Sequence, residues 1–425
     1  MLTGTAPAEL RNRVLSAPCA RVRSRGMSQN ARDYDIVLLG ATGFVGRFTA
    51  RHLAQSAPAG ARIAIAGRSS ARLQEVKRDL GVDWPIIEVD TADADADARL
   101  AASTSVVATT VGPYLRYGTE VASACARAGT SYADLSGESI FVARSIERNH
   151  DVAQNSGARI VHSCGFDSIP SDVGLGIAHE AAGGVPIVAA TLRVRSLRGG
   201  VSGGTIDSLR QQMKEMKTDA STRRLVGDPY ALTPGPSVRL PGHRGSGLGK
   251  ERNAWQAPFV MGAYNQQIVQ RSNYLTGWSY GQLMRYREVI ATGRGFAGFS
   301  RAAGLSVGTA ALVAGLALPP TRALLDRVLP APGAGPSSNA IERGRFVLDV
   351  DAYPVEGQPV RTRIAAPFDP GYGGTGVMLG ESALSLAFDQ LPERGGVLTP
   401  MVAMGQSLAE RLRAQRFTLN VDTLH

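Results

Sequence analysis

The feature that most constrains this chain is a glycine motif near its start, Asp-Ile-Val-Leu-Leu-Gly-Ala-Thr-Gly-Phe-Val-Gly at residues 35–46. An apolar run ends at Gly40, and a helix-compatible segment continues through residues 44–56. Glycine permits a tight turn and close approach of the backbone to a pyrophosphate, which the free N–H groups at the helix start would face. The spacing G-x-x-G-x-x-G therefore predicts a strand–turn–helix unit that binds a dinucleotide.

Two loops are expected to hold this nucleotide, because ligands of doubly wound sheets bind beyond the carboxyl ends of the strands. One is the glycine loop, and the other follows a strand expected at residues 105–110. Their predicted cofactor-binding residues are Gly40, Thr42, Gly43, Phe44, Val45, Gly46, Val111, Gly112 and Pro113.

The end of the next predicted strand indicates which dinucleotide is bound. Sites for NAD usually place an acidic residue there to bind the ribose 2′-hydroxyl, but this chain has Gly67 followed by Arg68 and Ser69. A guanidinium group suits a 2′-phosphate, with which it forms charge-assisted hydrogen bonds. We therefore predict NADP(H) as the cofactor, with Arg68 and Ser69 as ligands. Arg72 and Arg78 lie nearby and are alternative phosphate ligands.

Alternating strand-like and helix-like runs over residues 34–162 predict an α/β fold with a Rossmann-type, doubly wound parallel sheet. The expected strands are 35–39, 62–66, 86–89, 105–110, 131–134 and 159–162. The expected helices are 44–56, 70–80, 118–128 and 139–155. After residue 185, strand-like runs at 191–195, 345–350 and 360–365 indicate a mixed or antiparallel sheet, and hence a second, α+β substrate domain.

We accordingly expect four segments. Residues 1–33 form a disordered basic extension, since the first 26 residues hold five arginines and one acid; a transit peptide or an upstream start codon are alternatives. Residues 34–175 form the NADP-binding domain, and residues 176–398 form the substrate domain. Residues 399–425 supply a C-terminal helix and strand that return to the first domain.

An uncharged stretch at residues 302–321 reaches the minimum length of a membrane span, but glycines, Ser306 and Thr309 dilute its hydrophobicity. A buried helix, or one lying against another subunit, ranks first among the interpretations. Peripheral membrane contact ranks second and a true span third.

Composition excludes several classes of protein. The net charge is +10, yet no stripe of basic residues interleaved with aromatic residues indicates nucleic-acid binding. The three cysteines have neither a pairing pattern nor metal-ligand spacing, so we expect no metal site and a reducing cytoplasm, with membrane association left open.

The chain resembles the saccharopine dehydrogenase-like oxidoreductases, and in its later part their mycobacterial-type branch, the trans-acting enoyl reductases. The resemblance covers nearly everything from residue 34 onward. The segments that carry it are Gly40–Gly46, Ala66–Ser69, Thr110–Tyr114, Tyr132–Glu138, Cys164–Asp172, Val201–Thr205, Arg271–Asn273, Gly395–Pro400 and Ala403–Gly405. It implies reduction of a double bond in polyketide or fatty acyl chains that are carried by a synthase and become cell-envelope lipids.

Reduction of an enoyl thioester needs a hydride, a proton donor and a group that stabilises enolate charge. None of the eleven tyrosines has lysine four residues later, so the Tyr–Lys pair of short-chain dehydrogenases is absent. The predicted catalytic residues are Tyr114, Asp134, Cys164 and Asp167, which all follow predicted strands. The resemblance implies that Cys164 borders substrate and nicotinamide. Structural roles stay open for each, as they do for Glu138.

The leading hypothesis is an NADP(H)-dependent enoyl reductase acting on an acyl chain carried by a polyketide synthase or acyl carrier. A saccharopine-type amino-acid oxidoreductase is the second hypothesis. The third is a noncatalytic membrane- or lipid-associated protein that keeps the dinucleotide fold as a scaffold. A homodimer is left open as well.

Overall fold

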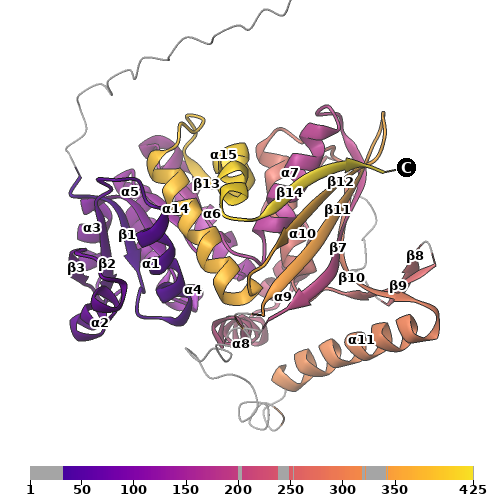
Figure 1. Cartoon of the computed structure of the whole chain (residues 1–425), viewed down its shortest axis with the longest axis horizontal. Coiled ribbons are helices and arrows are strands. Elements are labelled where there is room, and N and C mark those ends of the chain that lie inside the picture. The colour runs from indigo at the N-terminus through magenta and orange to yellow at the C-terminus, as the bar shows by residue number, and fades with distance from the viewer. Residues whose placement is uncertain are drawn as a thin grey trace, which may run out of the picture. The chain divides into compact units, whose positions relative to one another are not determined.

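Two seven-stranded sheets organise the chain (Figure 1). The computed structural model describes residues 32–199, 203–237, 248–251, 253–317, 321, 341 and 343–424. Most of the predicted N-terminal extension lies outside these residues. The first sheet has the order β13-β6-β5-β4-β1-β2-β3, and all its strands are parallel.

The strands of the first sheet confirm the predicted α/β architecture. They are β1 (Tyr34–Leu39), β2 (Ile63–Gly67), β3 (Ile86–Glu88), β4 (Thr104–Thr109), β5 (Ser131–Ala133), β6 (Arg159–Val161) and β13 (Gly396–Leu398). The run Ile36–Leu39 is buried, as expected of a strand covered on both faces. The chain order reverses between β1 and β4, so a crevice for a ligand opens beyond the ends of these two strands.

Helices cover both faces of this sheet, which makes it doubly wound. They are α1 (Phe44–Ser56), α2 (Ser70–Leu80), α3 (Ala94–Ser103), α4 (Tyr114–Tyr117), α5 (Thr119–Ala128), α6 (Ser139–Ser156) and α14 (Thr375–Phe388). Helix α14 comes from far along the chain and packs tightly on α1. A Cβ atom at Gly376 would lie 2.7 Å from the Cβ of Phe48, so this contact requires glycine.

The second sheet is mixed, which confirms the predicted α+β character of the later part of the chain. Its order is β14-β12-β11-β7-β10-β9-β8, and only the pair β7–β10 is parallel. Its strands are β7 (Ile187–Arg198), β8 (Gly249–Glu251), β9 (Ala254–Pro258), β10 (Arg285–Arg294), β11 (Arg345–Pro354), β12 (Val360–Ala366) and β14 (Thr418–Thr423). The predicted hairpin is the antiparallel pair β11–β12.

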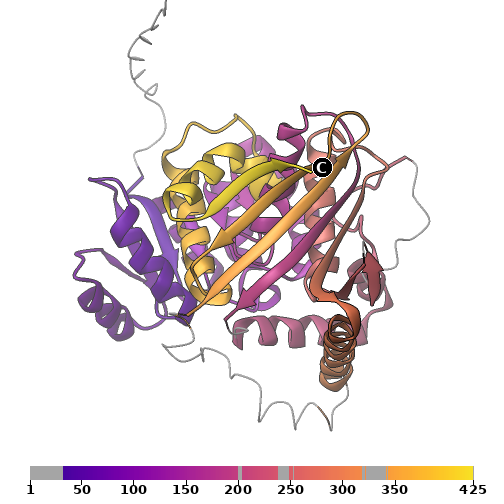
Figure 2. The same cartoon turned by 45° about the vertical axis from the view of Figure 1, so that its right-hand side comes forward.

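The remaining helices lie around the second sheet and between the two sheets (Figure 2). They are α7 (Ile169–Ala181), α8 (Gly203–Thr218), α9 (Ala220–Gly227), α10 (Gly262–Leu275), α11 (Gly295–Ala317), the π-helix η1 (Pro370–Gly374) and α15 (Pro400–Ala414). Helix α7 is buried over nearly its whole length and contacts both β11 and β12.

The expectation that the C-terminal strand returns to the first domain is wrong. Strand β14 pairs with β12 at the edge of the second sheet, whereas the short strand β13 joins the first sheet beside β6. Helix α15 lies between them and contacts α7 and α14. Short runs such as Gly396–Leu398 carry no period that assigns them to a sheet, so only tertiary pairing decides.

The apolar stretch expected to be buried or to lie against another subunit is not buried within this chain and is largely exposed in it. It forms most of α11, in which Ala302 is buried while Leu305 and Val307 are exposed to 43% and 68%. The predicted end of this stretch, at residues 318–320, lies outside the described residues. Among the helices that the structure describes, none is long and apolar enough to cross a membrane.

Candidate active site

The glycine loop closes the turn between β1 and α1, as the motif predicted. Gly40 has a φ of +90°, a region that favours glycine. Its carbonyl oxygen accepts hydrogen bonds from the N–H of Gly43 and the hydroxyl of Thr110, each 3.0 Å long. A Cβ atom at Gly46 would lie 2.1 Å from that same oxygen. Residues 40 and 46 therefore need glycine for two different reasons, backbone conformation and close packing.

The start of α1 is arranged to receive an anion. Gly43 precedes the helix and no side chain caps it. The N–H groups at this end of a 13-residue helix therefore point into the crevice with the positive end of the helix dipole. Thr42, Phe44 and Val45 are partly exposed around this end. The Phe44 ring packs edge-on against Tyr372 of η1, with centroids 4.6 Å apart.

The second predicted cofactor loop lies directly beside the first. A Cβ atom at Gly40 would approach the Val111 side chain to 2.7 Å, so the ends of β1 and β4 form one continuous edge. Gly112 is exposed and its peptide bond to Pro113 is cis. The structure thus brings the residues of both loops together at the point where the strand order reverses.

Arg68 lies next to this edge, just beyond the end of β2. Its side chain is exposed and has no ion pair or hydrogen bond to any residue that the structure describes. Ser69 caps α2, since its hydroxyl accepts a hydrogen bond of 3.4 Å from the N–H of Arg72. A free guanidinium at the end of the second strand suits the 2′-phosphate of NADP(H). The residues present therefore fit that cofactor.

Tyr114, the first predicted catalytic residue, has its hydroxyl already engaged. The phenol is buried, donates to the carbonyl of Thr109 at 3.3 Å and accepts from the N–H of Leu135 at 3.1 Å. Burial, with a contribution from the charge of Asp134, raises its pKa well above the ordinary value. The hydroxyl ties the ends of β4 and β5 together, and this geometry offers little support for proton donation.

Asp134 is also fully buried and ties neighbouring strands. Its carboxylate lies 2.7 Å from Nδ1 of His162 and accepts from the N–H groups of Ser136 and Ser163 at 2.9 and 3.0 Å. These contacts join the ends of β5 and β6. They position the loops that surround the cofactor rather than a reacting atom.

Cys164 is buried as completely as Asp134. Its sulfur lies 3.6 Å from the carbonyl oxygen of Val161, and burial raises the pKa of the thiol far above its usual range. The group is therefore a protonated, inert thiol. With an exposed fraction of 0%, it lies beneath the surface of the site rather than lining an open pocket.

Asp167 differs from these three residues. Its side chain is partly exposed, and it has no hydrogen bond or ion pair to any described residue. Partial removal of this carboxyl group from water raises its pKa to about 6. A carboxyl group that titrates near neutral pH and has no protein partner is suited to general acid or base chemistry.

Sequence reasoning missed Tyr264 of α10, which lies across the ends of β5 and β6. Its hydroxyl is 2.5 Å from the hydroxyl of Ser163 and donates to the carbonyl of Ser136 at 3.1 Å. Ser163 itself has a φ of +66°, a strained conformation that recurs at functional sites. The aromatic-rich segment around Tyr264 was the only signal in the sequence, and such segments are more often core.

A second missed residue is Glu288, which lies in β10 behind Asp167. The carboxyl group is fully buried and accepts hydrogen bonds from Ser171, Asn265 and Tyr286 at 2.6, 2.9 and 2.7 Å. Burial raises its pKa to about 7, and the charge of Asp167 contributes in the same direction. No strand is predicted from the sequence at Arg285–Arg294, so nothing there marked Glu288 as a buried carboxyl group.

The two other acidic residues near this site hold helix ends. Glu138 accepts from the N–H groups of Tyr114 and Leu115, both at 2.9 Å, so it caps α4 rather than its own helix. Asp172 accepts from the N–H of Met401 at 2.8 Å and from the hydroxyl of Ser272. It therefore fastens the start of α15 to α7 and does not cap α7.

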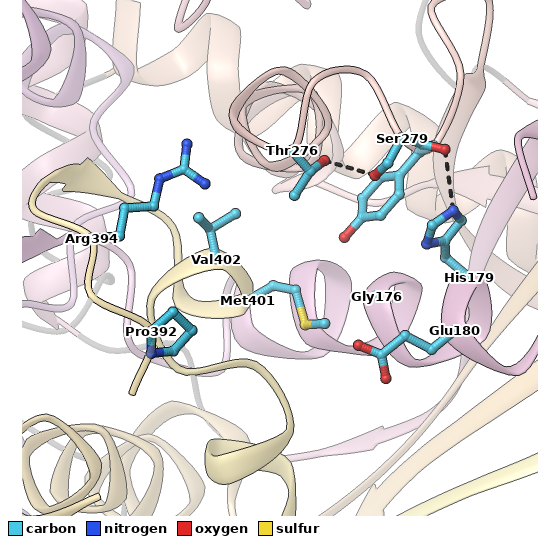
Figure 3. A pocket seen from close by; sticks show the side chains of 10 residues that line it. Gly176, His179, Glu180, Thr276, Ser279, Pro392, Arg394, Met401 and Val402 are labelled. Atoms are coloured by element: carbon cyan, nitrogen blue, oxygen red, sulfur yellow. Dashed lines mark hydrogen bonds between the residues drawn. The ribbon is translucent and has the colours of Figure 1, made fainter. Parts of the chain in front are cut away.

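A separate small cavity of about 240 Å³ lies between α7, α10 and α15 (Figure 3). Its lining residues are Gly176, His179, Glu180, Thr276, Ser279, Tyr280, Pro392, Arg394, Met401 and Val402. None of them is a predicted site residue. His179 faces the cavity but its Nε2 is 3.1 Å from the carbonyl oxygen of Ser279, so its ring is already bound (Figure 3).

The parallel sheet, the glycine turn with its uncapped helix and the free arginine define a dinucleotide-dependent oxidoreductase. Comparison with known proteins agrees with this class. Residues 36–161 match the model of the saccharopine dehydrogenase NADP binding domain. The apo saccharopine dehydrogenase (L-Glu forming) of Saccharomyces cerevisiae has the same fold, with a TM-score of 0.53 at 13% identity over 92% of this chain and 99% of that chain.

Relatives with much higher identity narrow the class. A Mycobacterium tuberculosis protein with the provisional name of a trans-acting enoyl reductase is 43% identical over 422 residues, covering 94% of this chain and 100% of that protein. A trans-acting enoyl reductase of Mycobacterium ulcerans is 40% identical over 425 residues, with the same coverage of 94% and 100%. The chain belongs to the trans-acting enoyl reductase family, and it is an NADP-dependent oxidoreductase.

Proposed function

We propose that this protein reduces the carbon–carbon double bond of an enoyl thioester whose acyl chain is carried by a polyketide synthase or an acyl carrier. The names of the relatives support the reaction class. The observation that carries the proposal is Asp167, a carboxyl group with no protein partner in the loop after β6. This loop lies at the same edge of the sheet as the glycine turn, as parallel topology requires.

In this proposal, bound NADPH would supply the hydride for the β-carbon of the enoyl group. Asp167 in its protonated form donates the proton to the α-carbon, so one C=C bond is reduced and NADP⁺ and a carboxylate remain. Solvent returns the proton to Asp167. Burial raises the pKa of Asp167 to about 6, so near neutral pH this carboxyl group is protonated more often than an ordinary aspartate.

The other residues of the site position these reacting groups. The backbone of the glycine turn and the start of α1 bind the pyrophosphate, while Arg68 binds the 2′-phosphate. Asp134 and Tyr114 hold the loops after β4, β5 and β6 in place through contacts to backbone groups. Their removal is expected to misplace the cofactor loops, with effects on both binding and turnover.

The test is NADPH oxidation by the full chain with an α,β-unsaturated acyl chain loaded on an acyl carrier protein. We expect Asp167→Asn to lower kcat about 100-fold or more, because the amide cannot donate the proton, and to leave the Kd for NADPH unchanged. Asp151→Asn changes an exposed carboxylate on α6 and serves as the matched control. Full turnover by Asp167→Asn contradicts the assignment of Asp167.

The reaction itself is tested by the product. Mass spectrometry of the carrier-bound chain should show a gain of two hydrogen atoms that depends on NADPH. Turnover of an amino-acid imine and none of the enoyl chain contradicts the proposed function and favours a saccharopine-type reaction. Tight NADPH binding without turnover of either substrate favours a scaffold.

A further inference from the structure

Helix α11 presents an apolar surface that no described part of the chain covers. Its 23 residues include Phe296, exposed to 83%, and Val307, exposed to 68%. Phe299 and Leu305 are exposed to 37% and 43%. Soluble proteins rarely leave contiguous apolar side chains in water, and such patches mark sites of interaction.

The helix is nevertheless firmly attached along one side. Phe299 packs edge-on against Trp255 of β9 with centroids 4.9 Å apart, and the hydroxyl of Thr292 donates to the carbonyl of Gly298 at 2.9 Å. Gly298 and Ala302 are buried against the second sheet. Both views show α11 on the outside of that sheet, beyond β9 (Figures 1 and 2).

The most exposed side chains share the face that points away from this attachment. Phe296 and Val307 are separated by eleven residues, which is close to three turns of an α-helix, so they lie on one face. Helical geometry places Ala303 and Ala310 beside this face as well. The result is an apolar strip, with its largest side chain at the beginning of the helix.

Cations flank the exposed part of the helix without lying in the strip itself: Arg301 is five residues after Phe296, about 140° around the helix axis from it, and Arg294 precedes the helix. Arg294 and Arg301 are exposed and have no ion pair to any described residue. Lys250 is exposed above the Trp255 ring, 5.9 Å from its centroid. No acidic residue occurs in the sequence from residue 289 to residue 317. Glu251 of the adjacent strand is held by Arg193 and Arg287, at 2.9 and 2.6 Å.

This pattern favours an anionic lipid surface over a second copy of the chain. A second copy of α11 would offer these arginines no acidic partner, because the helix contains neither Asp nor Glu. A bilayer that contains acidic phospholipids offers both an apolar phase for Phe296 and Val307 and negative headgroups for the cations.

We propose that the exposed face of α11 binds the surface of an anionic lipid bilayer, with the helix lying along the interface. Phe296 and Val307 enter the acyl region, and Arg294, Arg301 and Lys250 contact phosphate groups. This binding site is separate from the dinucleotide site and holds whether or not the proposed reaction is correct. It would keep the enzyme at a membrane on which long acyl chains can be released.

The test is co-sedimentation of the full chain with vesicles of phosphatidylcholine alone or with 30% phosphatidylglycerol. We expect binding to the anionic vesicles, at least tenfold weaker for the double variant Phe296→Ser/Val307→Ser because it loses apolar burial. We expect Arg294→Gln/Arg301→Gln to weaken binding about tenfold on anionic vesicles only. Val355→Ser alters an exposed apolar residue at the turn after β11 and should bind like the wild type.

NADPH affinity, measured on every variant, reports that the fold is intact and should not change. The proposal is overturned by an absence of binding to anionic vesicles, or by a Phe296→Ser/Val307→Ser variant that binds as the wild type does. It is also overturned if α11 joins two copies, which would appear in sedimentation velocity as a dimer that this double variant dissociates.

Discussion

The two sheets differ in where their charged residues lie. In the first sheet, β2 and β4 contain no charged residue, and the groups assigned to the cofactor lie beyond the strand ends, in loops and in the first turn of α1. In the second sheet, charged residues lie within the strands and are buried, among them Glu288, Asp349 and Asp351. Changes at the first sheet's loops should therefore alter ligand binding, and changes inside the second sheet should alter stability.

The ion pairs of β11 show what the second sheet gains from buried charge. Asp349 accepts from Arg195 at 2.9 Å and from Arg363 at 2.8 Å, and it has an exposed fraction of 0%. Burial alone would raise the pKa of Asp349, but the contacts to Arg363 and the neighbouring arginines outweigh it and lower the pKa. Such a carboxylate contributes stability above its ordinary pKa and loses it as the pH falls through the lowered value.

The largest effect that separates the sheets is expected for Asp349→Ala. This variant removes a fully buried carboxylate that Arg195 and Arg363 share, so we expect the free energy of unfolding to fall by about 3 kcal/mol with little change in NADPH affinity. Denaturant unfolding and a fluorescence titration measure the two quantities. Asp422→Ala removes an exposed carboxylate from β14 and should shift stability by less than about 0.5 kcal/mol. If Asp349→Ala remained stable but bound NADPH much more weakly, the proposed division between a sheet whose loops bind ligand and a sheet whose buried charges give stability would be wrong.

The next effect concerns the pH dependence that Glu288 brings to stability. Burial raises the pKa of Glu288 to about 7, so the folded state favours the protonated form and loses stability as the pH rises from about 4.5 to 7. Glu288→Gln has no such loss, and it should exceed the wild type by about 2–3 kcal/mol at pH 8 and match it at pH 5. Denaturant unfolding curves of the wild type and of Glu288→Gln at pH 8 and at pH 5 test this expectation. Glu147→Gln changes an exposed residue of α6 and serves as the control, so it should not alter the unfolding curve at either pH.

At Arg68 we expect a smaller effect, and it should change cofactor binding rather than stability. Arg68→Ala should raise the Kd for NADPH about 10- to 100-fold and leave the Kd for NADH and the Tm unchanged, because the exposed guanidinium has no protein partner. Titration of nicotinamide fluorescence with both cofactors provides the measurement. Arg72→Ala is the matched control, and a selective NADPH defect in that variant would move the 2′-phosphate contact to Arg72.

The smallest effect is expected at Ser69, which is predicted from the sequence to be a ligand of the cofactor. Since its hydroxyl caps α2, Ser69→Ala should lower the free energy of unfolding by about 0.5–1 kcal/mol. The Kd for NADPH should change by less than about threefold. A larger change in Kd than in stability would show that the hydroxyl also binds phosphate.

Much of the first sheet was predictable because its signals are local. A short apolar run followed by glycines specifies a buried strand, a tight turn and a helix within about 20 residues, and α1 and α2 have the predicted bounds. In the second sheet only β7, β11 and β12 were predicted, and the ten-residue strand β10 was missed. Strand β13 is three residues long, and α11 has the composition of a buried helix although it is exposed.

The predicted catalytic residues also show that local sequence patterns do not record tertiary contacts. Tyr114, Asp134, Cys164 and Asp167 all follow strands, so strand-end position alone could not separate them. They differ in whether the side chain has a hydrogen-bond partner in the protein. Some hydrogen-bond partners in this region come from distant parts of the chain, as with Ser163 and Tyr264, which are 101 residues apart.

The sequence by itself determined the class of fold, the NADP cofactor and the family, because these depend on residues close together in the chain and on glycine positions that backbone geometry explains. The tertiary structure alone decided which carboxyl group is free, where the C-terminal strand pairs and that α11 faces outward. Burial and hydrogen bonding depend on contacts between residues far apart in the chain, and no local pattern records them.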